Sequence, residues 1–360
     1  APEGDLAVFV VKPQTGWDPA SPASLSLRVT REKGQILPEK IVHEFSFPYA
    51  TPADLLIPPP AEDKGALGVW RARAGDSAVI AAACLALAVA LLAQQRFSQG
   101  GAFPWMRRAF LAFTLVFVGF WAQAQLSVVT LIGLVRAACG QGSLEFLLYD
   151  PPSLILWGFT LATLLVWGRG AFCGWLCPFG AMQELVADLA RRLGVKALRV
   201  PDAWDRRLKG LKYVALAAVL AAAAIPSAPA ETVAEVEPFK TAITLMFWRS
   251  APFALYAAGL VIGGAFVYKF FCRYLCPLGA AFALLGLLRR WLKRRVECGD
   301  PCQLCRVKCR YNAIRKDGSI VYRECFQCLD CVAIHQDARR CVPRVLEGKR
   351  RLISGPGGVI

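Results

Sequence analysis

Histidine and methionine are scarce in this chain. Of its 360 residues only His43 and His335 are histidine, and three are methionine. Histidine, in some proteins together with methionine, is a common ligand of haem iron. Two isolated histidines exclude a membrane haem bound by a histidine pair, and Met106, Met182 and Met246 offer no clear replacement. The shortage of methionine also argues against a copper transport pathway, although not against a copper reductase.

Several sequence motifs are also missing. The chain has no Walker loop, no dinucleotide fingerprint and no pattern of serine, histidine and aspartate typical of a hydrolase. No nucleic-acid motif accompanies its basic residues, so we expect no direct nucleic-acid binding. The start at Ala1 lacks the basic and apolar regions of an export signal, and we therefore expect residues upstream of it to be missing.

The chain has the composition of a membrane protein. Hydrophobic residues make up 56% of it, and its mean hydropathy is +0.43. Five uncharged stretches are long enough, or nearly so, to cross a bilayer at about 1.5 Å per residue. We therefore predict an α-helical membrane protein with five transmembrane helices. The predicted spans are Ser77–Gln95, Ala109–Val135, Pro151–Gly168, Tyr213–Ala230 and Ser250–Tyr268.

The net charge of +16 is unevenly placed along the chain. Arginine and lysine follow the first, third and fifth predicted spans, whereas the other two loops carry mostly acids. Basic loops stay on the cytoplasmic side of a membrane. We therefore predict a protein of the bacterial inner membrane, with the lipid bilayer as a partner, a periplasmic N-terminus and a cytoplasmic C-terminus.

The residues before the first span divide into a β-rich outer segment, 1–56, and a proline-rich linker, 57–76. Strand-like composition, with turn residues between, predicts three strands at Leu6–Val11, Ser24–Val29 and Ile41–Phe47. So short a segment forms a poor core alone, and we expect it to be the tail of a larger periplasmic domain.

The membrane domain, 77–296, contains an internal repeat. The sequence FCGWLCPFGA at 172–181 resembles FCRYLCPLGA at 271–280, so each copy carries a C-x3-C-P motif. Each copy precedes a helix-prone segment that ends in two arginines, and the proline suits the first helical turn. The second segment, Leu278–Leu288, is too short to span, so it should lie at the interface or pack on the bundle. The repeat predicts two similar half-bundles, each with a thiol pair at the cytoplasmic membrane edge.

The cysteines of the repeat are candidate redox or metal-binding thiols, namely Cys173, Cys177, Cys272 and Cys276. Helix N-termini stabilise thiolates, which favours such chemistry. We hypothesise that the four converge, and that they hold a third iron–sulfur cluster or copper, or act as two dithiols. The alternative is that they only pack at helix boundaries.

Eight of the fourteen cysteines lie in a C-terminal domain, 297–345, which a basic tail, 346–360, follows. They form two runs of four, as in ferredoxins with two cubane clusters, where the fourth cysteine of each run ligates the other cluster. The first [4Fe-4S] cluster is therefore expected on Cys298, Cys302, Cys305 and Cys341. The second is expected on Cys309, Cys325, Cys328 and Cys331. Such clusters move single electrons, so the spacing predicts an electron-transfer protein.

Zinc is the alternative occupant of the C-terminal thiols, because it also takes four thiolates and uses C-x2-C pairs. Two runs of four cysteines favour clusters over separated zinc-binding pairs. Two features depart from the ferredoxin pattern, since the first gap holds three residues and Arg310 stands where proline normally follows the fourth cysteine. His335 lies in an insertion, where we expect a solvated loop residue, although it could tune or ligate a cluster.

A candidate quinol site lies on the outer side. Glu237 and Lys240 follow the fourth predicted span, and Asp150 directly precedes the third. Quinol oxidation needs a proton acceptor near the interface, beside apolar and aromatic walls, which these residues could supply. The alternative is an interfacial helix with ordinary charges.

The chain resembles the NosR/NirI family of membrane iron–sulfur flavoproteins over most of its length. The two C-x3-C-P motifs, the sequence EPFK at 237–240 and the sequence CFQCLDC at 325–331 carry the likeness. NapH-like quinol dehydrogenases and CcoG-like copper reductases share the C-x3-C-P and ferredoxin layout. The resemblance implies support of periplasmic nitrous oxide reductase in denitrification. It also implies FMN in an upstream domain, attached at a Ser-Gly-Ala-Thr-type motif that is missing here.

The sequence leaves three functions open. In the first, electrons pass between the C-terminal clusters, the C-x3-C-P thiols, a quinol pool and a periplasmic acceptor, as in a quinol dehydrogenase. No visible residue then explains the path across about 30 Å of hydrocarbon. In the second, the C-x3-C-P thiols bind or reduce copper during maturation of the partner enzyme. In the third, the protein is a membrane redox sensor that regulates nos gene expression indirectly.

Overall fold

The computed structural model describes residues 23–33, 39–49, 65–140, 144–225, 230–288 and 302–353. The chain divides into two compact units, Ala1–Lys64 and Gly65–Ile360. In the first unit, β1 (Ala23–Lys33) and β2 (Glu39–Tyr49) pair antiparallel. These strands confirm two of the three predicted strands and extend both. The third, Leu6–Val11, lies outside the described residues.

The second unit begins with helices, where a linker was predicted. From Gly65 onward the chain forms α1 (Ala66–Ala72) and α2 (Ala74–Leu92), so the predicted linker is wrong for residues 66–76. The proline-rich part of the linker lies outside the described residues. After the short α3 (Gln94–Phe97), α4 (Phe103–Phe113) continues as the π-helix η1 (Thr114–Trp121). Both α2 and the α4–η1 helix have 19 residues and are apolar enough to cross a membrane.

The second predicted span, Ala109–Val135, is wrong at both ends. Its helix begins at Phe103 and ends at Trp121, and the chain turns before α5 (Val128–Ala138) begins. Gln123 takes a left-handed backbone conformation there, with φ of 49°. Ser127 caps α5, because its hydroxyl accepts a hydrogen bond from the backbone N–H of Val129 at 3.2 Å. A left-handed residue and a helix cap thus separate two helices within one uncharged run, and hydropathy reveals neither of them.

The remaining helices complete a bundle. The short η2 (Glu145–Tyr149) precedes α6 (Pro151–Val166), and α7 (Pro178–Arg192) follows the first C-x3-C-P motif. Then come α8 (Asp202–Ala224), α9 (Ala230–Ala234), α10 (Ala251–Phe266), α11 (Phe270–Tyr274) and α12 (Pro277–Leu285). With 16 residues each, α6 and α10 are shorter than α2. Among the described residues, two helices are thus both long and apolar enough to span a membrane, and five spans stay a prediction.

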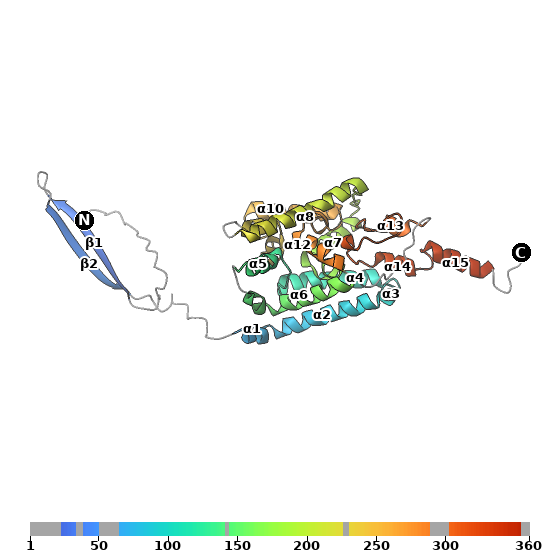
Figure 1. Ribbon diagram of the computed structural model, residues 1–360, viewed down its shortest axis with the longest axis horizontal. Helices are drawn as coiled ribbons and strands as arrows, with labels where there is room; N and C mark the ends of the chain where they lie inside the picture. The colour runs from blue at the N-terminus through green and yellow to red at the C-terminus, as the bar shows by residue number, and fades with distance from the viewer. Residues whose placement is uncertain are drawn as a thin grey trace. The chain divides into compact units, whose positions relative to one another are not determined.

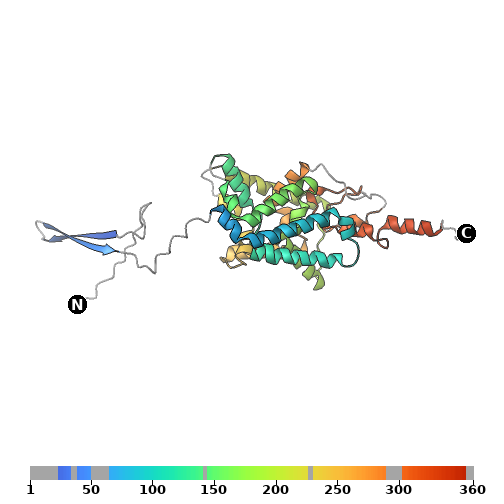
Figure 2. The ribbon, with the colours of Figure 1, turned by 90° about the horizontal axis from the view of Figure 1, so that it is seen from below.

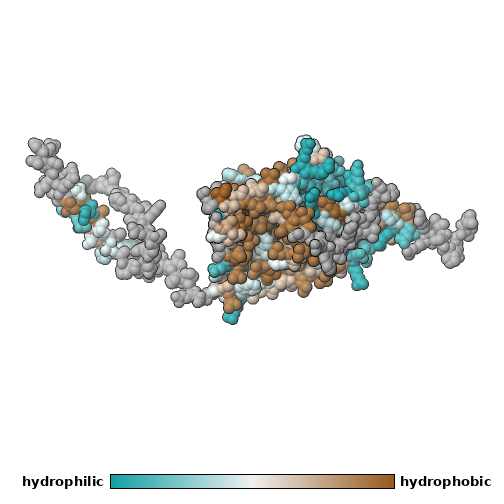
Figure 3. Space-filling model, viewed as in Figure 1, coloured by the Kyte–Doolittle hydropathy of each residue, from teal (hydrophilic) through white to brown (hydrophobic). Residues whose placement is uncertain are grey.

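The outer surface of the bundle is apolar. Large side chains on four different helices face outward, with Leu85 67% exposed, Val116 60%, Leu161 49% and Leu255 72%. Figure 3 shows hydrophobic residues spread over the bundle, with hydrophilic residues gathered toward the end where α8 begins. A soluble domain rarely exposes so broad an apolar surface, whereas lipid covers it in a membrane.

The C-terminal domain packs on one end of the bundle and shares its core. It contains α13 (Leu304–Lys308), η6 (Tyr322–Glu324), α14 (Asp330–Gln336) and α15 (Val342–Ile353), which extends from that end in both views (Figures 1 and 2). Tyr311, Phe326 and Leu329 belong to the same buried cluster as Trp175 of the membrane domain. The two predicted domains are thus one packed body.

Candidate electron-transfer site

The second cysteine of each C-x3-C-P motif caps a helix. Cys177 caps α7 and Cys276 caps α12, and each sulfur accepts a hydrogen bond from the backbone N–H of the glycine three residues on. The distances are 3.4 Å to Gly180 and 3.2 Å to Gly279. The N-terminus of a helix carries partial positive charge. Each motif therefore places a sulfur where negative charge is stabilised.

The four thiols of the repeat lie together. Cys173, Cys177, Cys272 and Cys276 are between 4% and 6% exposed. Cys272 donates a hydrogen bond to Cys177, and Cys276 is close enough to interact electrostatically with Cys173 and Cys177. We call these four residues the thiol centre. Among the described residues, no three histidine, cysteine or acidic side chains come close enough to hold one metal ion. A four-iron cluster spreads its thiolates more widely, because iron and sulfide lie between them.

The thiol centre lies inside the bundle. The predicted position at the membrane edge is therefore wrong. At one end of the α4–η1 helix Arg107 contacts the backbone of Cys328 in the C-terminal domain. Toward the other end, a Cβ added at Gly119 would lie 2.9 Å from Pro178. Helix α7 thus starts deep in the bundle and runs back beside α10, where Gln183 donates to a backbone carbonyl at 2.9 Å. Helices that begin at such depth are a known way to build ion and substrate sites in membranes.

The second predicted cluster set lines one cavity. Trp167, Tyr311 and Val332 line the same cavity. The four cysteines of the set are Cys309, Cys325, Cys328 and Cys331. This donor set fits an iron–sulfur cluster, since four thiols line one largely aromatic and aliphatic pocket.

The first predicted set is described only in part. Cys302, Cys305 and Cys341 are described, whereas Cys298 lies outside the described residues. The sulfur of Cys305 lies 3.9 Å from the carbonyl oxygen of Cys331, so the two sets are adjacent. His335 is half-buried in α14, and the expectation of a solvated loop residue is therefore wrong.

The loop of the second set touches the first C-x3-C-P motif. A Cβ added at Gly174 would fall 1.9 Å from the carbonyl oxygen of Phe326, so only glycine allows this approach. The indole N–H of Trp175 donates a hydrogen bond to the carbonyl of Gln327 at 2.9 Å. Gly174 and Trp175 lie between the two cysteines of the motif. The backbone that holds the second cluster set is therefore in direct contact with the backbone that holds the thiol centre.

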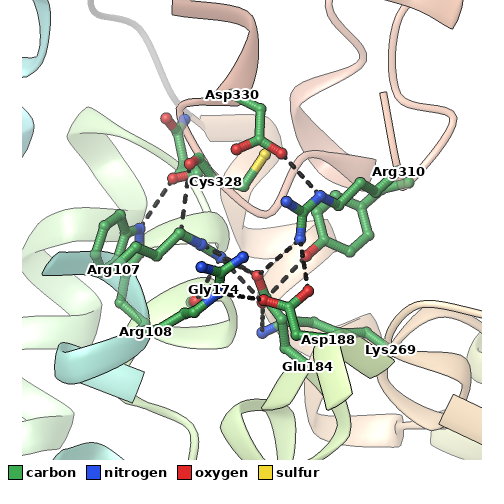
Figure 4. Close-up of polar contacts among 12 residues, drawn as sticks. Arg107, Arg108, Gly174, Glu184, Asp188, Lys269, Arg310, Cys328 and Asp330 are labelled. Atoms are coloured by element: carbon green, nitrogen blue, oxygen red, sulfur yellow. Dashed lines mark hydrogen bonds and ion pairs between the residues drawn. The ribbon is translucent and has the colours of Figure 1, made fainter. Parts of the chain in front are cut away.

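A buried carboxylate binds the C-terminal domain to the bundle (Figure 4). Glu184 of α7 is 1% exposed, and its oxygens lie 2.8 Å from Arg107 and 3.3 Å from Lys269. From the C-terminal domain, the hydroxyl of Tyr311 donates to Glu184 at 3.1 Å, and Arg310 lies 3.8 Å away. Arg310 replaces the proline of the ferredoxin pattern, and here it supplies a docking charge.

A second carboxylate forms a similar joint at the start of α8. Asp205 is 1% exposed and lies 2.7 Å from Lys209, 2.6 Å from Arg273 and 3.2 Å from the side-chain amide of Asn312. Burial by itself raises the pKa of Asp205. The hydrogen bond from Lys209 and the charge of Arg273 outweigh burial, and the pKa lies below its ordinary value. Asp205 is therefore ionised at neutral pH.

Two buried cations in the repeat were missed by the sequence reasoning. Lys269 precedes the second motif, and its ammonium donates to the carbonyl of Cys173 in the first motif at 2.9 Å. Arg169 precedes the first motif and donates to the carbonyl of Gly279 in the second at 3.3 Å. Each half thus extends a positive charge to the motif of the other half. The sequence signal that could have found both cations is a single charged residue directly after an apolar stretch.

The three candidate quinol residues do not form one site. Glu237 is 4% exposed, accepts hydrogen bonds from the backbone N–H of Val128 at 2.8 Å and from a serine hydroxyl, and faces the thiol centre. The side chain of Asp150 is 41% exposed and pairs with Arg73 at 2.8 Å. The side chain of Lys240 is 64% exposed. Only Glu237 belongs with the buried site.

Comparisons with known proteins identify the family of this chain. A family model described as NosR matches residues 296–352, and a model described as a 4Fe-4S binding domain matches 149–196 and 251–295, which contain the two motifs. The Regulatory protein NosR of Stutzerimonas stutzeri is 40% identical over 360 residues, or 96% of this chain and 49% of that protein. The chain belongs to the NosR/NirI family.

Other relatives of this NosR/NirI-family chain extend the comparison. Protein NirI of Paracoccus denitrificans is 41% identical over 276 residues, which are 76% of this chain and 40% of that protein. The Putative electron transport protein YccM of Escherichia coli is 32% identical over 187 residues, 50% of this chain and 52% of that protein. The chain spans about half the length of the curated NosR relative it matches. No solved structure matches.

The Glu184 joint of this NosR/NirI-family chain is open to test. Glu184→Gln leaves Arg107 and Lys269 buried without their counter-charge, which we expect to lower the free energy of unfolding by about 3 kcal/mol. Thermal unfolding in detergent, followed by loss of cluster absorbance, measures the change. The matched control is Arg340→Gln, because Arg340 is 69% exposed and 4.0 Å from Asp337. The control should change stability by less than about 0.5 kcal/mol. Equal effects of the two substitutions would contradict a buried joint.

Proposed function

We propose that this chain conducts single electrons across a membrane. They pass between two four-iron clusters in the C-terminal domain and a redox partner on the opposite side, with the thiol centre as the intermediate station. The contact of Gly174 with Phe326 carries this proposal, because it brings the second cluster loop against the first C-x3-C-P motif. A relative described as a putative electron transport protein supports the same class of function.

The depth of the thiol centre answers the problem of distance. The hydrocarbon region is about 30 Å thick, and the chain has no histidine pair for haem. A station inside the bundle divides that distance into two shorter steps. On its far side lies Glu237, a buried carboxyl group that interacts electrostatically with Cys276. We propose that Glu237 links the thiol centre to the outer side of the bundle.

The occupant of the thiol centre is proposed to be a third iron–sulfur cluster. When bound, such clusters supply one-electron redox chemistry. The 4Fe-4S binding model matches both halves of the repeat, which favours iron over copper. The chain's own residues hold the site closed: Phe172 and Phe271 are 2% and 0% exposed and exclude water beside the thiols. Arg169 and Lys269 place positive charge at the two motifs, which suits an anionic occupant.

The partners follow from the family and from the charge pattern. We propose that the C-terminal domain faces the bacterial cytoplasm, since basic loops lie on its side, and that five spans cross the inner membrane. On the periplasmic side the acceptor or donor is the quinol pool or nitrous oxide reductase, in support of denitrification. The family resemblance further implies FMN as a cofactor of the full-length protein.

Iron, acid-labile sulfide and copper analysis with EPR on anaerobically purified protein tests the proposal. About eight irons per chain are expected for the two C-terminal clusters, and about twelve with a third cluster in the thiol centre. Eight irons with one copper would instead favour copper handling by the thiol centre. Zinc without iron would overturn the proposal altogether.

A further inference from the structure

A cleft of about 670 Å³ lies between the first turns of α8 and the C-terminal domain. One wall is the start of α8, from Asp202 to Tyr213, and the other is the segment that precedes Cys325. Six basic side chains line it, and we call it the basic cleft. They are Arg206, Lys209, Arg306, Arg315, Lys316 and Arg323.

The acidic side chains of the cleft are already neutralised. Asp202 lies 2.9 Å from Arg306, and Asp205 lies 2.7 Å from Lys209. The third acid, Glu324, lies 2.8 Å from Lys212 beneath the cleft. These pairs use two of the six basic side chains that line the cleft. The acids therefore do not cancel the rest of its positive charge.

Four cations of the basic cleft remain for a ligand. Arg206, Arg315, Lys316 and Arg323 are exposed, and none forms an ion pair within the part of the chain that the structure describes. Three of the four belong to the C-terminal domain and not to the membrane helix. These four exposed side chains present positive charge to a partner that approaches from solution.

The basic cleft adjoins the second cluster set. Its wall residue Glu324 directly precedes Cys325, and Ile314 lines both the cleft and the cavity of the four cysteines. A redox group seated over the cleft would therefore lie beside the cavity. Positive charge around an electron-transfer site recruits negatively charged carriers and raises their association rate.

We propose that the basic cleft docks an acidic, soluble one-electron carrier protein that reduces the second cluster. The inference rests on the proposed function and names the partner on the side of the C-terminal domain. In the step, the reduced carrier loses one electron and the oxidised cluster gains it. No bond is made or broken and no proton is transferred.

The test uses the full chain in detergent with an acidic [2Fe-2S] ferredoxin as the probe. After the ferredoxin is reduced, stopped-flow absorbance follows bleaching of the clusters. The charge-reversal variant is Arg206→Glu with Arg323→Glu, which should lower the second-order rate constant at least about tenfold and weaken its dependence on salt. The matched control is Lys196→Glu with Arg339→Glu, two exposed residues outside the cleft, which should keep the rate of the unmodified protein.

Dithionite separates the docking inference from the proposed function. Clusters that dithionite bleaches equally in all variants show that the redox groups are intact. Clusters that are absent or inert in the unmodified protein would overturn the proposed function itself. Equal rates in the charge-reversal and control variants would overturn only the docking inference. A second outcome would also overturn the docking inference: an anionic phospholipid co-purifies with the unmodified protein and is lost from the charge-reversal variant, while the rate of cluster reduction stays the same. The cleft would then bind lipid and not a carrier protein. If the glutamate variant loses iron, Arg206→Gln with Arg323→Gln gives the same test with half the change in charge.

Discussion

Gly174→Ala should disconnect the C-terminal clusters from the thiol centre. The added Cβ would lie 1.9 Å from the carbonyl oxygen of Phe326, so the two backbones must move apart. The hydrogen bond from Trp175 to the carbonyl of Gln327 is then lost as well. The two redox centres are then held farther apart, and because electron transfer slows with distance we expect a clearly lower transfer rate. The measurement is electron transfer across proteoliposomes, from a reductant on the C-terminal side to an impermeant acceptor on the other.

Gly158→Ala is the matched control, because it adds the same methyl group at a position without close neighbours. Gly158 lies in α6, and a Cβ added there would meet nothing within 4 Å. Alanine in an exposed helix position is favoured over glycine by about 1 kcal/mol, so this variant should be at least as stable as the unmodified protein. Its transfer rate should be unchanged. If Gly174→Ala also transfers electrons at the full rate, the loop contact is not the route.

Replacement of Cys177 and Cys276 by serine should abolish transfer across the membrane while both helices remain capped. Serine is a favourable N-cap residue, so α7 and α12 keep their first turns. Its hydroxyl is a poor ligand for iron in place of a thiolate. We expect the iron content to fall from about twelve to about eight per chain, with the EPR signals of the C-terminal clusters retained.

Cys84→Ser tests whether the loss is specific to the thiol centre. Cys84 is also buried, at 4% exposed, but it lies in α2 and caps no helix. Its replacement should leave iron content and transfer unchanged. Full iron content together with full transfer in the double variant would contradict the role of the thiol centre. An unchanged iron content with lost copper would assign that centre to copper instead.

Local patterns in the sequence predicted local structure well. The strand-like residues around Val29 and Phe45 form β1 and β2, and the prolines of both motifs begin helices as expected. These features depend on neighbours within a few residues. The break near Gln123 escaped prediction because no charged residue marks it in the apolar run. A left-handed residue at Gln123 and the cap at Ser127 separate the two helices there.

The depth of the motifs could not be predicted for a related reason. A short helix such as α12 has the same composition whether it lies on the membrane surface or begins inside a bundle. Its position is set by partners far along the chain, such as Phe172, whose ring centroid lies 5.7 Å from that of Phe282 in α12. The same holds for Glu237, which hydropathy places in an outer loop and packing places at the thiol centre.

The sequence by itself supplied the candidate donor atoms of this protein, because the spacing of the thiols and the cysteine–proline pairs that begin helices depend on neighbouring residues. It also determined the family, through the same motifs. Only the tertiary structure decided which thiols meet, how deep they lie and which loop touches them. The reason is that Gly174 and Phe326 come together through packing and buried charge between distant segments, which no local pattern encodes.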